Sequence, residues 1–207
     1  MNYWHEFLTV ALVHILAVMS PGPDFAVVTK NSLVYSRKSG LMSALGIGLG
    51  ILVHVTYSII GVALIISKTP LLLTVIKYVG ACYIAYLGYL SLSDKYHAAK
   101  NAKHEAGHDL SRGQSLKMGF ITNITNPNAT LFFLSIFTTL ISAHTPIVIK
   151  TLYGLEMSVA TFAWFALVAL VFSHSILKNR ISGVQFYIEK IMGVVLLLLA
   201  LKIFLNR

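Results

Sequence analysis

The stretch Ser20-Pro21-Gly22-Pro23-Asp24 interrupts a long apolar run that extends from Phe7 to Leu33. Proline and glycine free backbone polar groups, and at bilayer depth those groups must find partners within protein or around a watery cavity. Ser20 is a good N-cap and Pro21 a good first helical residue, because proline has no N–H to leave unpaired in a first turn. We therefore predict two half-helices, the second beginning near Pro21 with Asp24 in its first turn, and interpret the break as a functional site.

The composition places the chain in a membrane. Of the 207 residues, 57% are hydrophobic and 11% are charged, and the mean hydropathy is +0.77, which a water-soluble domain of this length does not comfortably tolerate. We predict an all-α integral membrane protein in which a single domain, 1–207, forms six transmembrane helices. Apolar segments near the roughly 20-residue spanning length lie at about 4–34, 40–67, 70–93, 116–142, 146–176 and 183–205.

The basic residues indicate topology rather than nucleic-acid binding. The net charge is +9, but the 16 Lys and Arg residues mostly lie in short segments between the apolar runs. If the amino terminus is outside, eleven of them are inside and five outside, so the positive-inside rule favours both termini outside. The inside group is Lys30, Arg37, Lys38, Lys95, Lys100, Lys103, Arg112, Lys117, Lys178, Arg180 and Lys190. The outside group is Lys68, Lys77, Lys150, Lys202 and Arg207.

A second break occurs in the fourth apolar segment, at Asn123-Ile124-Thr125-Asn126-Pro127-Asn128. Asn126 before Pro127 repeats the pattern of a capping residue followed by proline, 106 residues after Pro21. Both breaks fall near the bilayer midplane, in helices that run in opposite directions. We therefore predict an inverted repeat, of about 1–93 and about 116–207, joined by a cytoplasmic loop of about 94–115. This pattern is typical of secondary transporters.

Three ionisable residues at membrane depth are candidates for function, since a charge there costs about 2.5–3.5 kcal/mol on insertion scales. Asp24 either carries chemistry or only stabilises the first turn of its half-helix. His54 is either functional or a hydrogen-bonded packing residue, and Glu156 is either paired to a neighbour or part of a proton relay. Near His54, Gly46 and Gly50 form a small face that favours close approach of another helix.

The loop between the third and fourth segments contains His104-Glu105-Ala106-Gly107-His108. This matches the pattern in which two His on a helix hold zinc and the Glu acts as general base. A glycine interrupts the required helix, so a membrane metalloprotease is the weaker hypothesis and we expect no metal site. A passive channel or a packing subunit is a third alternative. The sequence has no phosphate-binding loop, which argues against direct use of ATP.

Taken together, these motifs resemble the LysE/RhtB family of bacterial amino-acid exporters. The resemblance rests on residues 20–25, Gly46 to Gly50 with His54, Gly80 through Tyr86-Leu87-Gly88, and Gly119-Phe120 through Asn126-Pro127 to Phe133. The opening Phe7-Leu8-Thr9-Val10-Ala11 and the later Ala163-Trp164-Phe165 are most similar to threonine or homoserine exporters. The chain departs from the family at Asn128, where a lysine is usual.

The resemblance implies a secondary exporter, not an enzyme, in the bacterial inner membrane, with no cofactor. Its partners would be a small neutral amino acid, protons and the lipid bilayer, while leucine-like or lysine-like substrates and a homodimer stay open. The substrate carboxylate would lie at the two half-helix N-termini, and Asp24 with freed carbonyls would hold the ammonium. The implied binding residues are Ser20, Pro21, Gly22, Pro23, Asp24, Asn123, Asn126, Pro127 and Asn128, and the proton-coupling candidates are Asp24, His54 and Glu156.

Overall fold

The protein is a bundle of long helices in a computed structural model that describes residues 3–20, 22–68, 70–93, 109–173 and 178–205. The elements in chain order are α1 (Tyr3–Val18), α2 (Pro23–Lys30), a short π-helical segment η1 (Asn31–Tyr35), α3 (Arg37–Lys68), α4 (Pro70–Leu92), α5 (Arg112–Ile124), α6 (Pro127–Thr139), α7 (Ile147–Phe172) and α8 (Lys178–Leu205). No strand occurs in the described part of the chain. The prediction of an all-α protein is therefore confirmed there, and both proline motifs separate consecutive helices.

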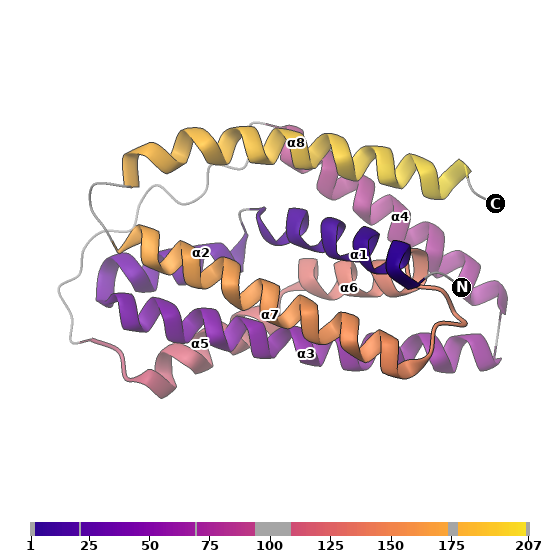
Figure 1. Cartoon of the computed structure of the whole chain (residues 1–207), viewed down its shortest axis with the longest axis horizontal. Helices are drawn as coiled ribbons and strands as arrows, with labels where there is room; N and C mark the ends of the chain where they lie inside the picture. Colours follow the sequence, from indigo (N-terminus) through magenta and orange to yellow (C-terminus); the bar gives the residue numbers. More distant parts are fainter. Residues whose placement is uncertain (1–2, 21, 69, 94–108, 174–177, 206–207) are drawn as a thin grey trace.

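Chain direction alternates along the long axis of the molecule (Figure 1). The pair α1 and α2 runs from the end that carries both termini toward the opposite end, whereas the pair α5 and α6 runs the other way. The start of α1 and the end of α8 therefore lie at the same end of the molecule. Both helix breaks lie near the middle of this axis.

Two helices, Arg37–Gly61 of α3 and Ile147–Phe172 of α7, are long and apolar enough to span a membrane. The segments Tyr3–Val18 and Pro23–Tyr35, bent by 57°, make a third span if they are counted together. The outer face of α7 supports this assignment, because large apolar side chains spaced at helical intervals stay exposed: Val148 and Val159 at 65%, Leu152 at 53% and Leu155 at 47%. The six-span inverted repeat remains a prediction.

The buried core holds the two broken helices against the rest of the bundle. One apolar cluster joins α1, α3, α4, α6, α7 and α8, and a second joins α2, α3 and α7. The close approach of α3 to α5 depends on glycine, as predicted: a Cβ on Gly46 would lie 2.1 Å from the Leu116 carbonyl oxygen, and one on Gly50 2.4 Å from Asn123 Oδ1. The glycine face of α3 thus sets the position of Asn123.

Similar carboxylate contacts occur at the two ends of the bundle. Glu6 Oε2 accepts from the Ser142 backbone N–H at 3.0 Å, and Glu6 Oε1 accepts from Thr145 Oγ1 at 2.9 Å. At the other end, Asp109 Oδ1 accepts from Ser36 Oγ at 3.0 Å and from Ser39 Oγ at 2.8 Å. Hydrogen bonds from Ser36 and Ser39 lower the pKa of Asp109, so this carboxylate is ionised at neutral pH.

Candidate functional site

The two helix breaks are built differently. At the second break, Asn126 caps α6 through its side chain, which accepts from the Asn128 backbone N–H at 3.0 Å, and Pro127 begins the helix. This prediction is confirmed. At the first break, α2 begins at Pro23, and its N-cap is Gly22 in extended conformation without a side-chain capping bond.

The expectation that Ser20 caps the second half-helix, with Pro21 as its first residue, is wrong. The residue before a proline is sterically disfavoured from helical conformation, so Gly22 is extended and the helix starts only at the second proline. Pro21 itself lies outside the described residues. Asp24 still lies in the first turn of α2, as predicted, because the helix starts only two residues later than expected.

Asp24 joins the two breaks. Its Oδ2 atom accepts hydrogen bonds from Asn123 Nδ2 at 2.8 Å and from Asn126 Nδ2 at 3.4 Å, across 99 and 102 residues of sequence. Asn123 belongs to the last turn of α5, and Asn126 is the cap of α6. The other carboxylate oxygen, Oδ1, is buried without a hydrogen-bond partner in the described structure. The two breaks are therefore joined by the Asp24 carboxylate, and its Oδ1 atom is left able to accept a hydrogen bond.

A cavity of about 100 Å³ lies at this junction. Seven of the nine predicted binding residues line it: Ser20, Gly22, Pro23, Asp24, Asn123, Asn126 and Asn128. Pro127 starts α6 but is not in the lining, and Pro21 is not described. The remaining wall is mostly apolar and consists of Ala17, Val18, Ile51, Ala129, Phe132, Phe133, Thr161, Phe165 and Leu196. The cavity thus has a polar side from the two breaks and an aromatic side from α6 and α7.

Asn128 is held by a tyrosine of α4. Tyr83 Oη donates to the Asn128 carbonyl oxygen at 3.0 Å and lies 3.1 Å from its side-chain Oδ1. This contact ties the first turn of α6 to a helix of the other half of the chain. Asn128 therefore fixes the start of α6 without adding a positive charge to the cavity.

His54 lies behind the cavity rather than in its lining. Its Nε2 is 3.0 Å from the Asn123 carbonyl oxygen, and its Nδ1 contacts the Tyr57 hydroxyl. A carbonyl can only accept, so Nε2 carries a proton, and in the neutral ring Nδ1 accepts from the Tyr57 hydroxyl. The ring also stacks on Phe133, with centroids 5.5 Å apart. His54 is thus connected to Asp24 through a single residue, Asn123.

Glu156 is not brought to this junction. It is half-buried on α7, outside the cavity lining, and its Oε2 atom has no hydrogen-bond partner in the described structure. His104, Glu105 and His108 lie outside the described residues. Among the residues that the structure describes, no group of three His, Cys, Asp or Glu is placed to hold a metal ion.

The sequence reasoning missed His14 and Thr161. His14 is fully buried, its Nε2 lies 3.2 Å from Thr161 Oγ1, and Thr161 lines the cavity. The His14 ring packs beside Phe132 and Phe133, with centroids 6.3 and 6.0 Å away. The criterion that selected His54, an ionisable residue in an apolar segment, applies equally to His14 and would have found it.

The sequence matches a known protein family and several named proteins. The family profile described as LysE type translocator matches residues 15–207. A protein named threonine efflux protein from Salmonella typhi is 36% identical over 171 residues, covering 81% of this chain and 82% of that protein. A protein of the same name from Escherichia coli (strain K12) is 35% identical over 168 residues, with the same coverage.

A further relative carries a different name. A protein named leucine efflux protein from Salmonella choleraesuis (strain SC-B67) is 35% identical over 152 residues, covering 70% of this chain and 66% of that protein. No solved structure matches the chain.

The difference between the two breaks predicts different costs for two otherwise similar substitutions. Asn126→Ala removes the cap of α6 and should lower the free energy of unfolding by about 1 kcal/mol. Ser20→Ala removes no capping bond and should leave stability unchanged. Thermal unfolding of the purified variants in detergent measures both. Equal losses for the two variants would mean that Ser20 caps α2 after all.

Proposed function

Because the chain belongs to the LysE-type translocator family, we propose that it is a proton-coupled secondary exporter of small neutral amino acids such as threonine and homoserine. The observation that carries the proposal is Asp24 in the cavity wall, fixed by two amides and left with one unpaired carboxylate oxygen. A buried, unpaired carboxylate oxygen is a ready acceptor for a substrate ammonium group. The names of the Salmonella and Escherichia coli relatives support threonine as a substrate.

The substrate carboxylate binds at the helix starts on the same side of the cavity. The first turns of α2 and α6 both meet the cavity, through Asp24 on α2 and through Ala129 on α6, whereas the Asn128 N–H is already bonded to Asn126 Oδ1. First-turn N–H groups lack partners within their own helix, and the helix dipole favours an anion at this end. A zwitterionic amino acid therefore finds an acceptor and donors at one junction.

The charge of the cavity favours a neutral amino acid over a cationic one. Asp24 is the only acidic residue among those that line the cavity, and it serves the α-ammonium, so a lysine side chain would have no counter-charge. Leucine is the stronger alternative, because the wall includes Phe132, Phe133 and Leu196 and one relative is named a leucine efflux protein.

We propose that the chain lies in the bacterial inner membrane with both termini outside and six spans in two inverted repeats. The opposite directions of the pairs α1–α2 and α5–α6 support the inversion, and the shared end of the first and last helices supports an even number of spans. The eleven-to-five distribution of basic residues supports the orientation. An inverted repeat supplies two broken helices that meet at one site.

Efflux of radiolabelled amino acids tests the proposed function. Cells that overproduce the chain and are preloaded with threonine, homoserine, leucine or lysine should lose threonine and homoserine fastest, since these substrates carry one ammonium and one small polar side chain. Cells that carry the empty vector are the control. Faster release of lysine, with unchanged threonine efflux, would contradict the assignment.

If Asp24 exchanges protons, its substitution should abolish proton-driven transport without affecting insertion into the membrane. Asp24→Asn keeps the size of the side chain and an oxygen that accepts from Asn123, but it cannot bind or release a proton. We expect this variant to reach the membrane in normal amounts and to lose threonine accumulation driven by an imposed pH gradient in vesicles. His54→Gln, one residue further from the cavity, should show a smaller defect.

Asp24→Asn with the wild-type rate and an unchanged pH profile would show that Asp24 does not couple protons to transport. The coupling group would then be sought at His54 or Glu156.

A further inference from the structure

The aromatic side of the cavity contains one hydroxyl. Among the lining residues, the polar ones belong to the two helix breaks except Thr161, which comes from α7, one turn before the apolar Phe165. A single polar group on an otherwise apolar wall determines how a ligand side chain is recognised. In the proposed function, the ammonium and carboxylate groups of the ligand bind at the helix breaks, on the other side of the cavity.

The Thr161 hydroxyl is positioned by His14. The two side chains are 3.2 Å apart across 147 residues of sequence, and both residues are buried, at 1% and 0% exposure. Phe132 and Phe133 pack beside the His14 ring and confine it. A hydroxyl has one donor and two acceptor positions, so in either tautomer of His14 it keeps capacity for a second partner.

We propose that Thr161, oriented by His14, selects substrates with a hydroxylated side chain. The inference rests on the proposed function and deepens it by assigning the side-chain end of the site. The substrate hydroxyl hydrogen-bonds to Thr161 while its apolar carbons pack on Phe132 and Phe133. Valine has the shape of threonine with a methyl in place of the hydroxyl, so it fits the same space but leaves Thr161 without this bond.

Competition between threonine and valine for efflux tests the assignment. Thr161→Val should lower the ratio of threonine to valine efflux about tenfold, since a site built around a hydrogen bond discriminates against ligands that lack it. Thr161→Ser keeps the hydroxyl and should keep the wild-type ratio. The ratio separates recognition from a general loss of folding, which lowers both rates together.

Two outcomes overturn the proposal. A Thr161→Val variant that is present in the membrane in normal amounts and keeps the wild-type ratio overturns the role of Thr161 alone. A wild-type chain that exports neither amino acid overturns the proposed function and, with it, this assignment.

A second, independent observation concerns the carboxylate contacts at the two ends of the bundle. Ser142 lies 106 residues after Ser36, and Thr145 lies 106 residues after Ser39, the same spacing that separates Pro21 and Pro127. Ser36 and Ser39 follow the pair α1–α2 and contact Asp109, which lies just before α5. Ser142 and Thr145 follow the pair α5–α6 and contact Glu6, near the start of α1. The contacts therefore correspond under the predicted inverted repeat.

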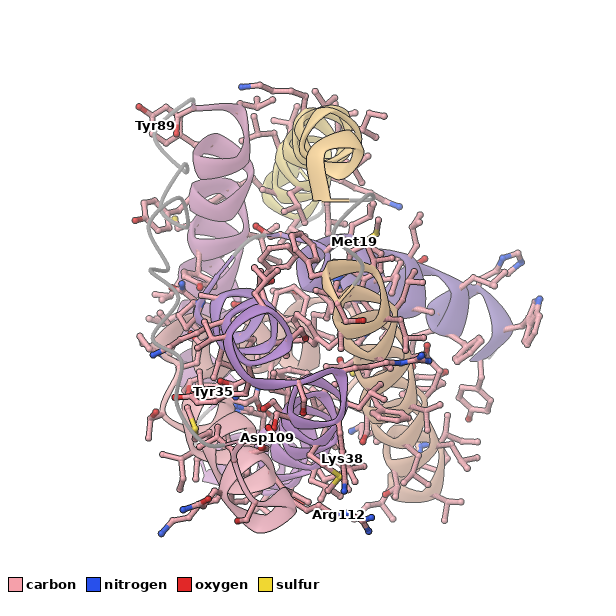
Figure 2. All side chains as sticks on the ribbon, turned by 90° about the vertical axis from the view of Figure 1, so that its left-hand side faces the viewer. Met19, Tyr35, Lys38, Tyr89, Asp109 and Arg112 are labelled. Atoms are coloured by element: carbon pink, nitrogen blue, oxygen red, sulfur yellow. The ribbon has the colours of Figure 1, made fainter. Side chains whose placement is uncertain are left out.

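We infer that the two contacts are gates: a termini-end latch of Glu6 with Ser142 and Thr145, and an opposite-end latch of Asp109 with Ser36 and Ser39. Figure 2 looks onto the opposite end, where Asp109 is near Tyr35 and Lys38. The cavity lies between the two ends, next to the helix breaks. A transporter must expose such a cavity to one side at a time, and each latch holds one side closed.

Accessibility of a cavity residue from each side tests the gates. Ala17, which lines the cavity, is replaced by cysteine in a background where the exposed Cys82 is serine. Thr145→Val weakens the termini-end latch and should speed labelling of position 17 by an impermeant maleimide in intact cells. Ser39→Ala weakens the opposite latch and should speed labelling in inside-out vesicles instead.

Two results would overturn the gates. Both variants could label faster from the same side, or neither could change the labelling of position 17 from the side that its latch faces. Western blotting of membranes confirms that the compared variants are present in equal amounts.

Discussion

The contact of Asp24 with Asn123 and Asn126 is the interaction on which the site depends. A helix break within an apolar bundle leaves backbone and side-chain polar groups that need partners, and a carboxylate there is costly unless it is hydrogen-bonded. Here each break satisfies the other, because the first supplies the acceptor and the second supplies two amide donors. Neither break is satisfied in this way alone, so the site requires both halves of the chain.

The scaffold around this contact is set by helix α3. Its glycines allow α5 to approach so closely that a side chain at Gly46 would collide with the Leu116 carbonyl group. Further along the same helix, Gly50 leaves space for the Asn123 side chain, and His54 binds the Asn123 carbonyl oxygen. Asn123 is therefore held on two sides by α3, and its amide is oriented toward Asp24. The glycine face of α3 therefore both allows close packing of α5 and fixes the position of Asn123 in the site.

Much of this arrangement is predictable from the sequence, because apolar length and proline position are local signals. The apolar segments coincide with the helices, and Asn126 caps α6 as expected. The start of α2 differs from the prediction because two prolines compete there, and the steric effect of Pro23 on Gly22 outweighs the capping preference of Ser20. The pair His14 and Thr161 depends on the packing of α1 against α7, which no local pattern specifies. The same is true of Glu156, whose distance from the cavity follows only from the rotation of α7.

The junction of the two breaks should bind both charged groups of a free amino acid. Isothermal titration calorimetry of the purified protein with threonine, N-acetylthreonine and threonine amide measures whether it does. Threonine should bind. Loss of the ammonium charge should weaken binding about tenfold or more, because Asp24 loses its partner, and loss of the carboxylate charge should do the same at the helix starts. Binding of N-acetylthreonine as tight as that of threonine would show that Asp24 does not hold the substrate.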